Sequence, residues 1–262
     1  MELTEMAAHI NRLADFCGPR DVPTLSRPAL MARCGIERAD VMALFGGAPL
    51  CGGDVLAGAM RAGIAKHYVI VGGAGHTTDT LRARMRRELP ELVDVADMPE
   101  AALFDAWLRR KHGLSADDLE TRSTNCGNNI TNLLALLEER GIPCASFILC
   151  QDAAMQRRMD AGLRKHRQEA LIINYAAYRA EVTADAGGLR FTSEIPGMWP
   201  MERYVSLLLG EIPRLTDNAQ GYGPMGRGFI AHVDVPEAVT AAYRALQRYY
   251  EVRGADDRFA TR

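Results

Sequence analysis

The chain has 262 residues, enough for one large α/β domain with a substantial core or for one domain with a smaller appendage. Apolar residues make up 48% of the sequence and charged residues 24%, as in ordinary soluble proteins. The net charge of −2 argues against nucleic acid or a membrane surface as a partner, and no apolar run approaches the roughly 18 residues of a membrane span.

The first residues and the cysteines indicate the cellular compartment. MELTEMAAHINRLADF carries acidic side chains and lacks the basic and apolar regions of a secretory signal, so we expect a cytoplasmic protein. The cysteines show neither CxxC spacing nor a nearby histidine partner, which predicts reduced thiols and no metal site. They are Cys17, Cys34, Cys51, Cys126, Cys144 and Cys150.

The first part of the chain predicts helices and two buried strands. Residues 1–36 are expected to form two helical pieces, because Gly18-Pro19 and Pro23 interrupt the pattern. DVMALFGG (40–47) and HYVIVGG (67–73) are short apolar runs that end in paired glycines, as buried strands do. Helices are predicted between and after them, in DVLAGAMRAGIA (54–65) and LRARMRREL (81–89).

The middle of the chain continues the alternation of helices and strands. A helix is predicted over 99–113, with proline in its first turn and Gly113 at its end, followed by a short strand in DDLETR. After a polar stretch, apolar residues at i, i+3, i+4 and i+7 from Ile130 predict one buried helix face. ASFILC (145–150) and ALIINY (170–175) predict two further strands, with a helix between them.

This alternation predicts a Rossmann-like three-layer α/β/α fold with a parallel sheet. We expect a helical N-terminal segment at 1–36, the Rossmann-like domain at 37–180, and a C-terminal helical extension at 181–262 packed on the domain.

Polar and glycine-rich loops follow the predicted strands, and ligands of such sheets bind beyond the carboxyl ends of the strands. Glycines there allow the backbone to approach a ligand, although for any single loop they simply end a strand equally well. No loop matches the dinucleotide fingerprint or the P-loop, since Thr78 replaces the third glycine after the second strand. The candidate ligand-binding residues are Gly46, Gly47, Gly72, Gly73, Gly75, Thr77, Ser123, Thr124, Asn125, Asn129, Gln151 and Asp152.

The stretch TRSTNCGNNITN (121–132) leads directly into a predicted buried helix. One of Ser123, Thr124 and Asn125 is enough to cap that helix, so the surplus amides and hydroxyls suit recognition of a polar ligand. Cys126 lies at the helix N-terminus, where the pKa of a thiol can fall, but no histidine or aspartate placed by the sequence supports it as a nucleophile.

Four other side chains are candidates for chemistry. His76 is either a general base or a loop hydrogen-bonding residue, and Glu100 is either an acid–base group or a favourable charge in the first turn of its helix. Arg157 and Arg158 follow Gln151-Asp152 and are either a clamp for a phosphate or carboxylate or ordinary surface arginines.

The motifs VGGAGHT, STNCGNN, QDAAMQRR and the tail GMWPMERYVSLLLGEIPRL occur in an order that resembles the bacterial SanA/YdcF domain-of-unknown-function family, and most closely its YdcF-like members. Asn128 stands where family members usually carry glutamate. The resemblance covers about Asp40 to Pro236 and implies a Rossmann-like domain with a C-terminal extension, a pocket at the strand ends, and S-adenosylmethionine as the ligand.

Three functions follow from these observations. The first is binding of a nucleotide-like small molecule, with S-adenosylmethionine as the leading candidate. The second is hydrolysis or transfer on a phosphorylated metabolite, with Arg157 or Arg158 on the anion and His76 or Glu100 handling protons. The third is ligand sensing without chemistry, in which binding moves the C-terminal segment. The sequence leaves the reaction and the oligomeric state open.

Overall fold

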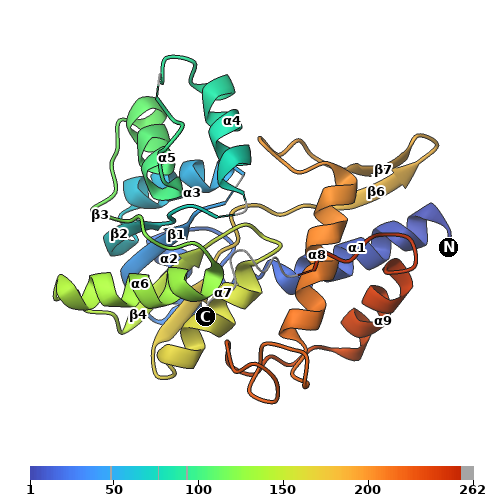
Figure 1. Ribbon diagram of the computed structural model, residues 1–262. Helices are drawn as coiled ribbons and strands as arrows, with labels where there is room; N and C mark the ends of the chain where they lie inside the picture. Colours follow the sequence, from blue (N-terminus) through green and yellow to red (C-terminus); the bar gives the residue numbers. More distant parts are fainter. Residues whose placement is uncertain (48, 76, 93, 255–262) are drawn as a thin grey trace.

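A computed structural model describes residues 1–47, 49–75, 77–92 and 94–254, and its centre is a five-stranded sheet (Figure 1). The strands lie in the order β3-β2-β1-β4-β5, and all neighbours pair in parallel. They are β1 (Ala39–Phe45), β2 (Ala65–Val71), β3 (Asp118–Glu120), β4 (Ser146–Cys150) and β5 (Leu171–Asn174). Helices cover both faces, so the predicted three-layer Rossmann-like fold is confirmed.

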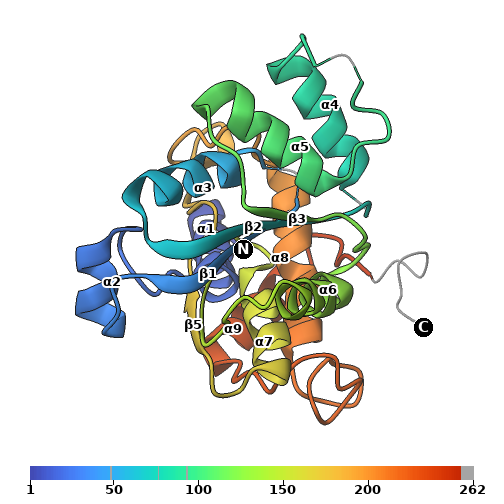
Figure 2. The ribbon, with the colours of Figure 1, turned by 90° about the vertical axis from the view of Figure 1, so that its left-hand side faces the viewer.

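Alternate residues of β1 point to opposite faces of the sheet, which explains why the whole strand is buried. Met42 and Leu44 pack with α3 (Cys51–Ala62) and α5 (Glu100–Trp107). Val41 and Ala43 pack with α6 (Cys126–Glu139) and α7 (Gln156–His166) on the other face. Figure 2 shows these two helix pairs on opposite sides of the sheet. The uninterrupted apolar runs of the sequence therefore reflect strands covered on both faces.

The N-terminal and C-terminal segments pack against each other beside the sheet (Figure 1). Helix α1 (Leu3–Cys17) contacts α8 (Met201–Leu215) and α9 (Glu237–Leu246), so the two ends of the described chain form one body. The remaining helices are α2 (Arg27–Cys34), α4 (Thr78–Glu88) and a π-helix, Leu108–His112, that extends α5 to Gly113. In the part of the chain that is described, no helix is long and apolar enough to cross a membrane.

The sequence predicts a helical C-terminal extension, but the structure shows that the extension also contains strands. It begins with an antiparallel hairpin of β6 (Val182–Asp185) and β7 (Gly188–Phe191). Gly188 has φ of 113°, a conformation that favours glycine and closes the turn. The hairpin is held by packing from distant parts of the chain, because Phe191 makes an edge contact with Tyr204 of α8 at 5.5 Å and the backbone of Val182 bonds to Asn11 of α1.

Candidate functional site

The order of the strands reverses between β1 and β4. From β1 the chain first adds β2 and β3 on one side, and then returns to add β4 and β5 on the other. The loops that follow β1 and β4 therefore diverge at the carboxyl edge of the sheet, and such a switch point is where open α/β sheets bind ligands. Gly46 begins one of these loops and Gln151 begins the other.

Glu100 connects the loops after β1 and β2. Its backbone N–H donates to the Gly73 carbonyl at 2.8 Å, and the next N–H donates to Gly72 at 2.8 Å. Its Oε1 accepts hydrogen bonds from Thr77 Oγ1 at 3.2 Å and Thr78 Oγ1 at 2.8 Å. A Cβ at Gly46 would lie 2.2 Å from Oε2, so only glycine leaves room for this carboxylate. The predicted residues Gly46, Gly72, Gly73 and Thr77 thus all lie around the Glu100 side chain.

The carboxylate of Glu100 has the properties of an acid–base group. It is only 7% exposed, and burial raises its pKa above the ordinary value, although the hydroxyls of Thr78 and Thr77 act in the opposite direction. Both threonine bonds go to Oε1, which leaves Oε2 with no hydrogen-bond partner among the described residues.

We expect Glu100→Gln to change how stability depends on pH. A carboxyl group whose pKa is higher in the folded chain contributes stability that is complete below its unfolded pKa and is lost as pH rises through its folded pKa. The amide cannot ionise, so above the ordinary value of 4.5 the variant should gain free energy of unfolding relative to the parent as pH increases. Urea unfolding at a series of pH values measures this difference, and parallel curves would contradict the assignment.

The polar stretch after β3 is organised by Glu120, which is 3% exposed. Its Oε1 accepts from the backbone N–H groups of Arg122 at 2.7 Å and Ser123 at 3.1 Å, and from Asn132 Nδ2 at 3.2 Å. Ser123 Oγ in turn accepts from the Gly73 N–H at 3.2 Å. Ser123 therefore lies beside Gly73 at the carboxyl edge of the sheet, as predicted, and we call this edge with its loops the rim. The Ser123 hydroxyl, however, bonds to the neighbouring loop.

Most of the surplus polar groups in this stretch form the cap of α6. Asn125 Oδ1 accepts from the Asn128 N–H at 3.0 Å, while Asn128 Oδ1 accepts from the N–H groups of Thr124 and Asn125, each at 2.9 Å. This reciprocal arrangement is a capping box built from two asparagines. Burial raises the pKa of the Cys126 thiol even though Arg158 favours the thiolate, which agrees with an inert cysteine.

Gln151 and Asp152 border the switch point together with Gly47. Gln151 Oε1 would lie 3.2 Å from a Cβ at Gly47. Asp152 Oδ1 accepts from Tyr178 Oη at 2.5 Å, and its Oδ2 accepts from Trp199 Nε1 at 2.9 Å. The cavity lined by Gly47, Gln151 and Asp152, which we call the switch-point cavity, has a volume of about 10 Å³, room for one water molecule. A larger ligand therefore requires the walls to separate.

The two predicted arginines do not join this rim. The Nε of Arg157 donates to the carbonyl of Phe16, and its guanidinium lies 4.4 Å from the centre of the Phe16 ring. Arg158 makes a two-bond ion pair with Glu211 of α8, at 2.5 and 2.9 Å. Both side chains thus attach α7 to elements outside the sheet.

The other predicted residues divide between the rim and its surroundings. The Gly75 N–H donates to Thr78 Oγ1 at 2.7 Å, and a Cβ at Gly75 would lie 3.1 Å from the Thr124 carbonyl, so Gly75 links the loops after β2 and β3. The side chain of Asn129, in the first turn of α6, makes no hydrogen bond to another described residue. His76 lies outside the described residues.

Sequence reasoning missed three groups that shape the rim. Glu120 ends a strand directly before a polar loop, a position that could have signalled its role. Thr78 was noted only as a departure from a glycine pattern, yet it donates the shorter bond to Glu100. The hydrogen bond from Trp199 to Asp152 spans 47 positions and leaves no local signal. The sequence matches no model of a known protein family.

Proposed function

We propose that the chain binds a nucleotide-like small molecule at the switch point, with S-adenosylmethionine as the leading candidate. The observation that supports this most directly is the position of Glu100, whose Oε2 lies against Gly46 without a hydrogen-bond partner among the described residues. A carboxylate held in this way favours a ligand that carries positive charge, and the sulfonium of S-adenosylmethionine provides one. The resemblance to the SanA/YdcF family points to the same ligand.

The surrounding loops suit the rest of such a ligand. Gly47 is only partly buried beside Gln151, so ribose hydroxyls or an adenine edge would hydrogen bond to the backbone there, whereas the buried Gly46, Gly72 and Gly73 let the neighbouring loops pack around Glu100. Helix α3 begins at Cys51, directly after the β1 loop, so its N-terminus favours a carboxylate. Because the cavity holds only about 10 Å³, we propose that binding moves the β1 loop away from Gln151.

A thermal-shift titration tests this proposal. S-adenosylmethionine at about 100 times its Kd should stabilise the chain by roughly 2.7 kcal/mol, a shift of about 5–10 °C. Glu100→Gln should weaken binding of the sulfonium about tenfold more than binding of its neutral product, S-adenosylhomocysteine, because only the former carries the positive charge at sulfur.

Two glycine variants supply the control. Gly47→Ala adds a methyl group 3.2 Å from the flexible end of Gln151, so it should narrow the cavity and reduce the shift. Gly58→Ala adds the same methyl group on an exposed part of α3 with nothing within 4 Å, and should leave the shift unchanged. Absence of a shift with either ligand at millimolar concentration would overturn the proposal.

A second candidate, sensing without chemistry, is favoured by the hydrogen bond between Trp199 and Asp152. Trp199 lies two residues before α8, so a ligand that moves Asp152 also disturbs the start of that helix. A change of tryptophan emission during the same titration, without consumption of ligand, would favour this candidate. The hydrolase or transferase alternative loses support, because Arg157 and Arg158 are engaged with Phe16 and Glu211.

A further inference from the structure

A second and larger cavity lies at the same edge of the sheet, beyond the ends of β4 and β5. It has a volume of about 320 Å³, within the range of small-molecule sites, and shares no lining residue with the switch-point cavity. Its walls come from the end of α1, the segment after α1, the segments after β4 and β5, and Tyr204 of α8, and we call it the α1–β5 pocket. No sequence motif had pointed to it.

One part of the pocket is basic. Arg20 and Arg179 both line it, and neither has an ion-pair partner among the described residues. Arg20 is held in place, since its Nε donates to the Ala176 carbonyl at 2.8 Å and its guanidinium lies 4.2 Å from the centre of the Tyr175 ring. Burial lowers the pKa of Arg20, and Arg179 is close enough to lower it further. Two unneutralised cations thus lie near each other.

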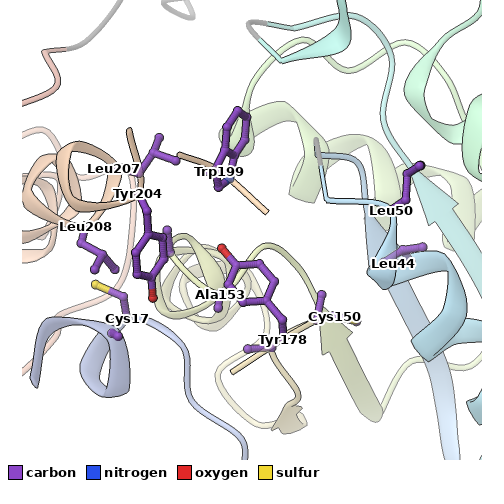
Figure 3. Close-up of a cluster of buried hydrophobic side chains, with 14 of the residues drawn as sticks. Cys17, Leu44, Leu50, Cys150, Ala153, Tyr178, Trp199, Tyr204, Leu207 and Leu208 are labelled. Carbon is purple, nitrogen blue, oxygen red and sulfur yellow. The ribbon is translucent and has the colours of Figure 1, made fainter. Parts of the chain in front are cut away.

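Another part of the pocket is acidic and includes a buried hydroxyl. Asp15 lines the pocket from α1 and also has no ion-pair partner among the described residues. Tyr204 is 0% exposed, and its hydroxyl has no hydrogen-bond partner in the described part of the chain. Figure 3 shows the rings of Tyr204 and Tyr178 on either side of Ala153, and all three line the pocket. The Tyr204 hydroxyl is covered, so it lies beneath the surface of the pocket and Asp15 provides the acidic group that a ligand can reach.

We propose that the α1–β5 pocket binds a small zwitterion of the α-amino-acid type. The carboxylate of the ligand lies on Arg20 and Arg179, and its ammonium group lies on Asp15. A ligand with only a negative charge would pair with the arginines but would be repelled by Asp15. A ligand with only a positive charge would pair with Asp15 but would be repelled by the arginines. Only a ligand with both charges gives each of the three side chains an oppositely charged partner.

The test is a thermal-shift screen of the full chain with each of the proteinogenic L-amino acids at about 10 mM. For a Kd near 1 mM, we expect the best amino acid to raise the melting temperature by about 3–6 °C. Its deaminated carboxylic acid and its decarboxylated amine, which each keep one charge, should give less than a third of that shift. No response to any amino acid, or an equal response to the carboxylic acid, would overturn the proposal.

Substitutions in the pocket test whether the amino acid binds there. Arg179→Gln and Asp15→Asn alter exposed side chains that have no ion-pair partners among the described residues, so both should fold and should weaken binding at least tenfold. Arg86→Gln, at an exposed position on α4, is the matched control and should bind as the parent does. Unchanged affinity in both pocket variants would exclude the pocket as the site.

Tyr204→Phe is a further control, because the Tyr204 hydroxyl lies beneath the surface of the pocket. The variant removes only a hydroxyl that has no partner among the described residues, so the chain should fold at least as stably as the parent. Because the hydroxyl is covered, the variant should bind the zwitterion as the parent does. A tenfold loss of affinity would contradict the placement of the ligand on Arg20, Arg179 and Asp15.

Discussion

Glu211→Ala is expected to lower the free energy of unfolding by about 3–5 kcal/mol. Glu211 lies on α8 at 2% exposure and accepts two hydrogen bonds from Arg158 of α7, at 2.5 and 2.9 Å. Arg214 adds a third contact to the same carboxylate at 3.6 Å. Removing the acid leaves the Arg158 guanidinium, whose side chain is 12% exposed, without its counter-charge. Urea unfolding followed by circular dichroism measures the loss.

Two further variants test whether the cost comes from an unpaired buried charge. Replacing both partners, as Arg158→Met with Glu211→Leu, removes the charges together and should recover most of the lost stability. Glu88→Gln removes one partner of the exposed pair with Arg87, and should change the stability by less than about 0.5 kcal/mol. A loss below about 1 kcal/mol in Glu211→Ala would contradict the view that this pair attaches the extension to the domain.

The fold was predictable because its signals are local. DVMALFGG and HYVIVGG combine an apolar run with terminal glycines, and β1 and β2 begin one and two residues before these segments and end within them. Strands covered on both faces need no alternation of polar and apolar residues, so the run alone is informative. The same applies to α6, whose apolar residues Ile130, Leu133 and Leu137 repeat with helical spacing and are all buried.

Part of the site was predictable for a topological reason. In a parallel sheet the ends of successive strands share one edge, so residues such as Gly46, Gly73 and Ser123 come together whatever their distance along the chain. What those side chains bind there was not predictable. The polar stretch at 121–132 mainly satisfies its own backbone, since Glu120 and Asn128 accept five N–H and amide bonds between them.

The remaining features depend on pairings across long stretches of chain. Arg158 meets Glu211 at a separation of 53 residues, and Trp199 meets Asp152 at 47. Each pairing follows from how the C-terminal extension packs, and neither partner carries a local pattern that identifies the other. The α1–β5 pocket escaped prediction for the same reason, because Asp15 lies before the Rossmann-like domain and Arg179 lies at the end of it.

Gly73→Ala is expected to cost about 3 kcal/mol or more, at the upper end of the range for overpacking. A Cβ there would lie 2.3 Å from the Ser123 carbonyl oxygen and 2.7 Å from that of Thr121. Both are backbone atoms, so no rotation of a side chain relieves the clash. The loop that carries them is also fixed by Glu120, which accepts the N–H groups of Arg122 and Ser123.

Gly58→Ala makes the same chemical change with the opposite expected sign. Gly58 lies within α3 with nothing within 4 Å of the added methyl group, so the helix should gain about 0.5–1 kcal/mol from the lower entropy of alanine in the unfolded chain. Urea unfolding of both variants measures the difference, which should exceed about 3 kcal/mol. Similar stabilities would mean that the loops after β2 and β3 do not press together, and the rim around Glu100 would then lack its support.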